Sequence, residues 1–154
     1  MSHMDVLLID DRPRHAASLR GVMREAFWQV QLHSAYTVSA AVQAAREARK
    51  FDLAVLRLEM PEWRDIEALS HIRSEVPWLR ILVISSTDDF GIAAAALNAG
   101  AVGCLPDTLS TFAKAAAIRL MAEADGIYAP SPEFLRRAPR HHVITPPPKQ
   151  ASPS

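Results

Sequence analysis

Cysteine and long hydrophobic runs are scarce in this chain, and each scarcity excludes a class of protein. The sequence holds one cysteine, Cys104, among its 154 residues. A single cysteine excludes an intramolecular disulfide framework and a cysteine-built metal site, and it fits a reducing compartment. No apolar run approaches the ~18–20 residues that span a bilayer, and no charged and then apolar segment opens the chain. We therefore expect a cytoplasmic protein with no membrane partner.

An excess of charge of either sign is also missing. Lys+Arg and Asp+Glu both number 17, so the overall charge favours neither nucleic acid nor a membrane as partner. A length of 154 residues, 49% of them hydrophobic, suffices for one domain with its own core. The opening Met1–His3 either belongs to the protein or is a tag remnant before a natural start at Met4.

Short apolar runs recur along the chain at intervals that leave room for a helix between them. Three of these runs are continuous, aliphatic and rich in β-branched residues: Val6–Ile9, Ala54–Leu56 and Ile81–Ile84. This pattern indicates strands that are covered on both faces, as in a parallel sheet. Val30–His33 and Val102–Leu105 are weaker strand candidates.

Between these runs the apolar residues recur with the period of an α-helix. The expected helices are one after Pro13, one that begins at Thr37 or Ser39 and ends near Arg49, one from Ile66 until Pro77, one over 91–99 and one over 110–124. Five strands that alternate with five helices predict a doubly wound α/β fold with right-handed crossovers. The periodicity alone leaves the strand order open.

In such a sheet the site lies beyond the carboxyl ends of the strands, near the point where the strand order reverses. Five candidate site residues follow the expected strands or lie at their ends: Asp10, Asp11, Arg57, Ser85 and Asp107. We therefore expect these side chains to gather at one edge of the sheet.

Several ordered signals resemble those of one family. The matching positions are Asp10-Asp11 after the first strand, Met60-Pro61 three residues after position 57, Ser85 at the end of the fourth strand and Gly100–Pro106 leading out of the fifth. Together, at these spacings, they resemble the receiver domain of bacterial two-component response regulators, the CheY-like family, over residues 4–128. The resemblance implies a flavodoxin-like (βα)5 fold with a five-stranded parallel sheet in the order 2-1-3-4-5.

The C-terminal part resembles one branch of that family. Gly126–Tyr128 and Val143–Pro146 are similar to segments of LuxR/NarL-type receivers, which carry a helix-turn-helix output domain. From Ser131 onward the chain becomes rich in proline, and Arg136, Arg137 and Arg140 add positive charge. We expect residues 129–154 to be a linker or tail, with no output domain in this chain. A functional tail is the other interpretation.

The resemblance implies a phosphate-accepting pocket whose central group is replaced here. In an ordinary receiver, an aspartate at position 57 accepts phosphate, and the acids at positions 10 and 11 help it to hold Mg²⁺. Arg57 stands at the acceptor position, and a guanidinium is not a nucleophile and keeps its proton at any biological pH. A fixed positive charge also opposes a divalent cation. We expect phosphoryl transfer and Mg²⁺ binding to be lost, leaving Asp10 and Asp11 as an ancestral acidic pocket without cofactor.

A second exchange accompanies the first. The family's lysine after the fifth strand is replaced by Asp107, so the acid and the base have traded places. Either Arg57 and Asp107 keep an ion pair across the pocket, or the two changes are independent losses that leave Asp107 in solvent. In both cases we predict that Arg57 is held by at least one of Asp10, Asp11 and Asp107, because an unpartnered buried charge is costly.

Two further positions correspond to the switch residues of the family. Ser85 occupies the position of the phosphate-binding hydroxyl, and it either retains a switching role or only caps the following turn. Cys104 falls where many receivers have the aromatic residue that moves on activation, and a small thiol there is expected to pack rather than react. Trp63, in the loop after the third strand, is either an exposed contact residue or partly buried.

Two functions follow from these residues. The first is a pseudo-receiver: a phosphorylation-independent signalling module of a DNA-binding transcriptional regulator. It would contact a second copy or an output domain through the face of helix four, strand five and helix five, and DNA only through a domain absent from this chain. The alternative is a sensor that binds a small anionic molecule in the pocket of Arg57 and the serines. No catalytic residue is expected, because the chain lacks a glycine-rich phosphate loop and a nucleophile paired with a base.

Overall fold

A five-stranded parallel sheet organises the protein. In the computed structural model, which describes residues 4–27, 29–48, 50–87 and 89–125, the strands are β1 (Met4–Ile9), β2 (Val30–Ala35), β3 (Leu53–Arg57), β4 (Ile81–Ser85) and β5 (Gly103–Pro106). They lie in the order β2-β1-β3-β4-β5 and pair in parallel throughout. The predicted flavodoxin-like fold and its strand order are confirmed.

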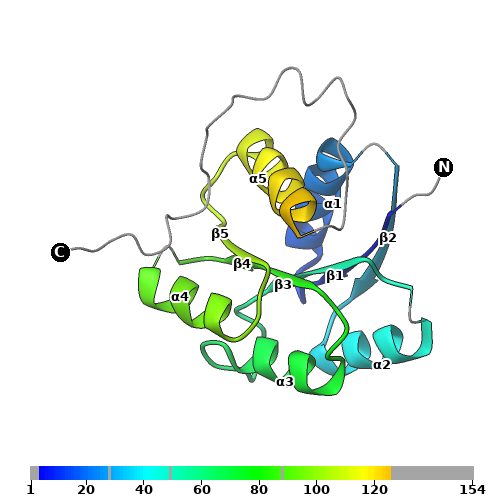
Figure 1. Ribbon diagram of the computed structural model, residues 1–154, viewed down its shortest axis with the longest axis vertical. Helices are drawn as coiled ribbons and strands as arrows, with labels where there is room; N and C mark the ends of the chain where they lie inside the picture. Colours follow the sequence, from blue (N-terminus) through cyan, green and yellow to red (C-terminus); the bar gives the residue numbers. More distant parts are fainter. Residues whose placement is uncertain (1–3, 28, 49, 88, 126–154) are drawn as a thin grey trace.

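Five helices cover the two faces of this sheet. They are α1 (Pro13–Ala26), α2 (Val38–Ala48), α3 (Glu67–Glu75), α4 (Phe90–Asn98) and α5 (Thr111–Ala124). Figure 1 shows α1 and α5 on one face and α2, α3 and α4 on the other. Each strand is therefore joined to the next by a connection that contains a helix, as parallel pairing requires.

The helix ends follow from side chains that satisfy the free backbone amides of the first turn. Thr37 Oγ1 accepts from the amide of Ala40 at 3.0 Å, which settles that Thr37, rather than Ser39, caps α2. Ser110 Oγ accepts from the amide of Ala113 at 3.1 Å, as expected for the start of α5. Asp89 caps α4 in the same way, so this helix begins at Phe90, one residue earlier than predicted.

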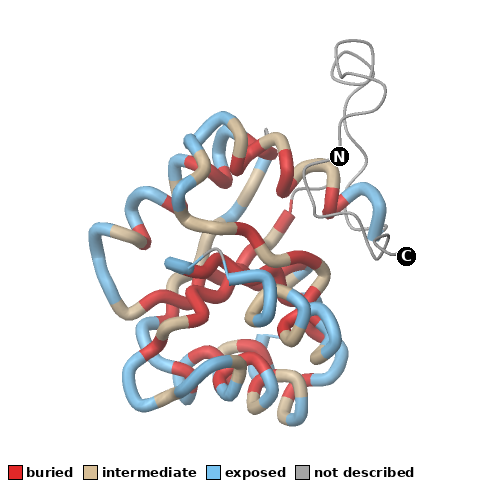
Figure 2. Tube along the Cα trace, turned by 90° about the vertical axis from the view of Figure 1, so that its left-hand side faces the viewer, coloured by how far each residue is buried: buried red, intermediate tan, exposed pale blue. Residues whose placement is uncertain are grey.

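The core forms two layers, one on each side of the sheet. Leu7 and Ile9 belong to the layer beneath α2, α3 and α4, whereas Val6 and Leu8 belong to the layer beneath α1 and α5. Figure 2 shows the buried residues gathered in the middle of the molecule, with the exposed ones on the outer helix faces and loops. Every residue of β3 is buried. Arg57, the last residue of this strand, is therefore buried as well.

The weaker strands differ from their predicted bounds. β2 continues to Ala35, and β5 begins at Gly103 and includes Pro106. Because β5 is an edge strand, the missing amide of Pro106 costs no ladder bond on its open side. Among the residues that the structure describes, no helix is both long and apolar enough to cross a membrane. The expected linker, residues 129–154, lies outside the described residues.

Two glycines give a matched test of this packing. A Cβ at Gly103 would lie 2.2 Å from Met121 Sδ and 3.0 Å from Leu82 Cδ1, whereas a Cβ at Gly21 meets nothing within 4 Å. Gly103→Ala is expected to lower the free energy of unfolding by about 1–3 kcal/mol through overpacking. Gly21→Ala, in the exposed interior of α1, is expected to raise it by roughly 0.5–1 kcal/mol. Urea unfolding checks both, and equal stabilities of the two variants would contradict the described packing.

Candidate functional site

The candidate residues meet at the carboxyl edge of the sheet, as predicted from the parallel strands. Asp10 follows β1, Arg57 ends β3 and Ser85 ends β4. Asp107 follows β5, and its amide donates to the carbonyl of Ser85 at 2.7 Å. The loops after neighbouring strands are therefore joined at this edge, and their side chains point toward shared partners.

Arg57 is the central group of the edge. Its side chain is 3% exposed, and its Nε donates to Asp10 Oδ2 at 3.2 Å. Its Nη1 lies 3.0 Å from Asp107 Oδ2, although the N–H bonds of Nη1 do not point well at this oxygen. The contact with Asp107 is therefore mainly one of charge. The prediction that Arg57 is held by at least one of the three acids is confirmed.

The surroundings of Arg57 keep it charged. Burial by itself lowers the pKa of the guanidinium, but the carboxylates of Asp107 and Asp10 outweigh burial and leave the pKa raised. Arg57 is thus a permanent cation in the interior, and its charge is balanced by two carboxylates from different strand ends.

The two acids after β1 have different roles. Asp10 has a fully buried side chain, and both of its oxygens are used: Oδ1 accepts from the amide of Arg12 at 3.0 Å and Oδ2 accepts from Arg57. His15 Nδ1 lies 4.0 Å from the same Oδ2. Asp11 is only partly buried, and its Oδ1 is a buried oxygen with no hydrogen-bond partner among the described residues. Of this pair, only Asp10 is an ion-pair partner of Arg57.

The residues present do not fit the Mg²⁺ ion that the resemblance implies. Mg²⁺ requires near-octahedral oxygen ligands, but Asp10 is already occupied by a guanidinium and a backbone amide. Within the described part of the chain, no group of three or more His, Cys, Asp or Glu residues is arranged to hold a metal ion.

Sequence reasoning missed one member of the site, Lys114. Its side chain is 9% exposed, and its Nζ donates to Asp107 Oδ1 at 2.8 Å. Lys114 shares the core-facing stripe of α5 with Ile118 and Met121, at i, i+4 and i+7. A lone lysine on an apolar stripe was the signal that could have located it, because such a charge requires an acidic partner inside the fold.

Four side chains thus form a row of alternating charge, which we call the ion-pair row: Asp10, Arg57, Asp107 and Lys114. Partial burial by itself raises the pKa of Asp107, whereas the hydrogen bond from Lys114 and the positive charges of Arg57 and Lys114 lower it, to about 2. Of the two interpretations of Asp107, the structure supports the ion pair, because this side chain touches two cations and is 30% exposed.

Ser85 belongs to a second network at the same edge. Its Oγ donates to Glu59 Oε2 at 2.6 Å and accepts from the amide of Thr87 at 3.2 Å. The amide of Ser86 donates to Glu59 Oε1 at 3.0 Å. The capping interpretation of Ser85 is therefore realised, but together with a carboxylate that the sequence analysis had not placed in the site.

Trp63 is partly buried, which is one of its two expected placements, and Cys104 is partly buried and packs against the core, as expected. Burial, with the nearby charge of Glu59, raises the pKa of the Cys104 thiol to about 11, so the reactive thiolate is scarce at neutral pH. Trp63 lies against His71, with ring centroids 5.1 Å apart.

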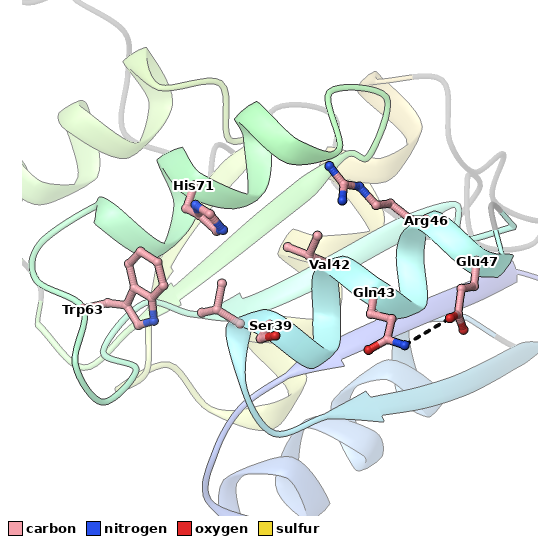
Figure 3. Close-up of a pocket in the computed structure, with 8 residues that line it drawn as sticks. Ser39, Val42, Gln43, Arg46, Glu47, Trp63 and His71 are labelled. Carbon is pink, nitrogen blue, oxygen red and sulfur yellow. Dashed lines mark hydrogen bonds between the residues drawn. The ribbon is translucent and has the colours of Figure 1, made fainter.

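Trp63 and His71 also border a surface groove of about 400 Å³ between α2 and α3. Figure 3 shows the two rings on one side of this groove and the α2 side chains on the other, including Val42 and the hydrogen-bonded pair Gln43 and Glu47. None of the residues of the ion-pair row lines the groove. It is therefore separate from the candidate site.

One protein family matches most of this chain in sequence. The family model for the response regulator receiver domain matches residues 6–113. The chain belongs to the response regulator receiver family. This match begins within β1 and ends in the first turn of α5, and it therefore includes every residue of the ion-pair row except Lys114.

Individual relatives agree with this family. The transcriptional activator protein ExaE of Pseudomonas putida is 29% identical over 121 residues, which cover 79% of this chain and 53% of that protein. The alginate biosynthesis transcriptional regulatory protein AlgB of Pseudomonas aeruginosa is 29% identical over 111 residues, covering 68% of this chain and 24% of that protein. The chain thus spans about half of the length of ExaE and about a quarter of the length of AlgB.

A solved structure shows the same fold over nearly its whole length. The two-component response regulator of the LuxR family from Aurantimonas sp. SI85-9A1 is 28% identical, with a TM-score of 0.67, and the match covers 88% of this chain and 94% of that chain. The receiver fold of this chain is thus shared with a LuxR-family regulator.

The lowered pKa of Asp107 predicts how acid weakens the fold. In the folded receiver this pKa is about 2, below the ordinary value of 3.8, so the carboxylate stabilises the fold above pH ~4 and loses this effect as the pH falls toward 2. Asp107→Asn removes the effect. The difference in unfolding free energy between wild type and Asp107→Asn should therefore be largest near neutral pH and shrink between pH 4 and 2.

Urea unfolding at several pH values measures this difference. Thr108→Ala is the control, because it changes the same loop without removing a carboxylate, and its curve should run parallel to the wild type. A difference in unfolding free energy that is the same at every pH would show that the charge of Asp107 does not stabilise the fold.

Proposed function

We propose that this receiver is the regulatory half of a transcriptional regulator and that it works without phosphorylation. Buried Arg57, paired with Asp10 and Asp107, is the observation that carries the proposal. The receiver would comprise residues 4–128, and residues 129–154 would link it to an output domain. Arg57 stands at the position that the family resemblance assigns to the phosphate acceptor.

The chemistry of the edge opposes phosphoryl transfer at each step. A guanidinium offers no oxygen for the phosphoryl group, and Asp10, one of the two acids that would help to hold Mg²⁺, binds this cation of the protein instead. The ion-pair row also joins the ends of β1 and β3 to the loop after β5 and to α5. We infer that these internal charges hold the receiver in one conformation.

A receiver with one conformation would act through the surface that it presents, and α4 is the best candidate. Its nine residues include no charged side chain, and only Ala96 is buried. Phe90 is 75% exposed and Leu97 is 42% exposed, and Phe112 at the start of α5 is 75% exposed. Large apolar side chains at such exposure favour a protein partner. The partner would be a second copy of the receiver or its output domain.

The role in transcription rests on the relatives. ExaE is named a transcriptional activator protein and AlgB a transcriptional regulatory protein, and both are longer than the matched region. DNA would be bound by an output domain rather than by residues 1–154. The basic cluster of Arg136, Arg137 and Arg140 offers about three phosphate contacts, which are too few for tight binding at physiological salt.

The alternative, a sensor for a small anionic molecule at Arg57 and the serines, has less support. The polar groups that would bind such a molecule already have internal acceptors: Arg57 faces Asp10 and Asp107, and Ser85 donates to Glu59. With its side chain 3% exposed, Arg57 also offers little surface to a ligand. A ligand would have to displace carboxylates of the protein before it could bind.

The first test concerns phosphorylation. The full chain, incubated with acetyl phosphate and Mg²⁺, is expected to keep its intact mass, because position 57 lacks a nucleophile and the metal lacks its ligands. Mass spectrometry of the intact chain measures this, with a receiver that retains its aspartate as positive control. A stable adduct of one phosphoryl group, mapped to Glu59, Asp65 or Asp107, would refute the proposal.

The second test concerns the α4 surface. Phe90→Ser combined with Leu97→Glu is expected to weaken self-association, or binding to the output domain, by at least about tenfold without changing the circular dichroism spectrum. Tyr36→Ser is the matched control, because Tyr36 is 50% exposed and follows β2, at the opposite edge of the sheet. Analytical ultracentrifugation measures the effect. Equal losses in both variants would exclude α4 as the specific contact.

A further inference from the structure

Two hydrogen-bond donors at the start of the loop after β4 converge on one carboxylate. The hydroxyl of Ser85 donates to Glu59 Oε2 at 2.6 Å, and the amide of Ser86 donates to Glu59 Oε1 at 3.0 Å. A hydroxyl and a backbone N–H aimed at the same anion form the kind of cradle that binds phosphate or carboxylate groups. In this receiver the cradle holds a side chain of the protein, which comes from the loop after β3.

A continuous series of hydrogen bonds leads from this cradle to α4. Ser85 Oγ accepts from the amide of Thr87 at 3.2 Å, and Thr87 Oγ1 accepts from the amide of Asp89 at 3.1 Å. Asp89 Oδ1 then accepts from the amide of Gly91, in the first turn of α4, at 2.7 Å. Each hydroxyl or carboxylate in this series fixes the backbone two residues further along the chain. The series ends next to Phe90, which is more exposed than Leu97, the other large apolar side chain on the outside of α4.

The carboxylate of Glu59 has access from solvent, whereas one of its two donors is buried. Ser85 is 1% exposed, so its donor is oriented inside the protein, whereas Glu59 is only partly buried. Glu59 also borders a hollow of about 350 Å³, whose lining includes Thr87 and two further carboxylates, Asp65 and Asp89. If the side chain of Glu59 were shortened, a small anion could approach the cradle from this hollow, and the charges of Asp65 and Asp89 would keep its affinity low.

We infer that Glu59 is a built-in anion, which fills an anion-binding cradle at Ser85 and Ser86 and thereby fixes the first turn of α4. The inference rests on the proposed function in one respect: α4 matters because it is the proposed contact surface. The cradle would otherwise take a small carboxylate or inorganic phosphate. Glu59 is a positioning residue, since it acts on α4 through Ser85, Thr87 and Asp89.

Three variants of the full chain test this. Glu59→Ala empties the cradle, Glu59→Gln keeps the shape but replaces one acceptor by a donor, and Glu62→Ala is the control from the same loop. Hydrogen exchange of the amides of Ser86, Thr87 and Gly91 reports whether the hydrogen bonds of the cradle and of the series are intact. The melting temperature, measured with and without sodium acetate against sodium chloride of equal ionic strength, reports whether an external anion replaces the side chain.

The expected results follow from the donors that lose their acceptor. In Glu59→Ala, the three amides should exchange roughly tenfold faster, and the melting temperature should fall by roughly 2–4 °C. Acetate should reverse both changes with a saturable dependence, whereas the wild type and Glu62→Ala should not respond. Glu59→Gln should lie between the wild type and Glu59→Ala.

Several outcomes would overturn the inference. Unchanged exchange in Glu59→Ala would show that Glu59 does not hold the loop. Faster exchange that acetate does not reverse would show that Glu59 holds the loop but that its donors do not bind an external anion. Faster exchange at Ser86 with unchanged exchange at Gly91 would show that the series stops short of α4. If Glu59→Ala does not fold, exchange in Glu59→Gln decides between these outcomes.

The test is independent of phosphorylation. A phosphoryl adduct on the wild-type chain would refute the proposed function and leave the exchange results at Glu59 as they are. Conversely, a chain that resists phosphorylation but shows no effect of Glu59→Ala would retain the proposed function and lose this inference.

Discussion

The charge of Arg57 has to be balanced inside the protein, because β3 is buried along its whole length and carries the guanidinium with it. Asp10 and Asp107 supply the balance, and Asp107 is in turn shared with Lys114. Removing one partner from such a set leaves a buried charge, at a cost of about 3–5 kcal/mol. The positions of β1, β3, the loop after β5 and α5 are therefore coupled through side chains at one edge of the sheet.

The same edge holds a second network of a different kind. Where the ion-pair row joins strand ends to α5, Glu59 joins the end of β3 to the loop before α4 through neutral donors. In both networks, charged or polar groups at the ends of the strands bind side chains from other parts of the receiver. An edge that is satisfied internally has little to gain from a ligand, which is the physical basis for proposing a receiver that is permanently in one state.

The fold could be predicted from the sequence because its signals are local. The continuous apolar runs of β1, β3 and β4 and the helical period between them depend on one segment at a time. Thr37 and Ser110 mark helix starts for the same reason, since each bonds an amide three residues away. The strand ends were less well predicted, in the centre as well as at the edges: β1 begins at Met4 rather than Val6, β2 extends to Ala35 and β5 includes Pro106.

The sequence by itself determined the (βα)5 order, the edge at which the polar residues meet and the loss of a nucleophile at position 57. Tertiary structure alone decided which charges pair. Arg57 and Asp10 lie 47 residues apart, Ser85 and Glu59 lie 26 apart, and even Lys114 and Asp107, which are 7 apart, meet across a turn. A pattern within one segment cannot specify such contacts. They arise because strands that are distant in sequence end side by side, and because each buried charge or donor must find its partner among the few groups that the fold brings within reach.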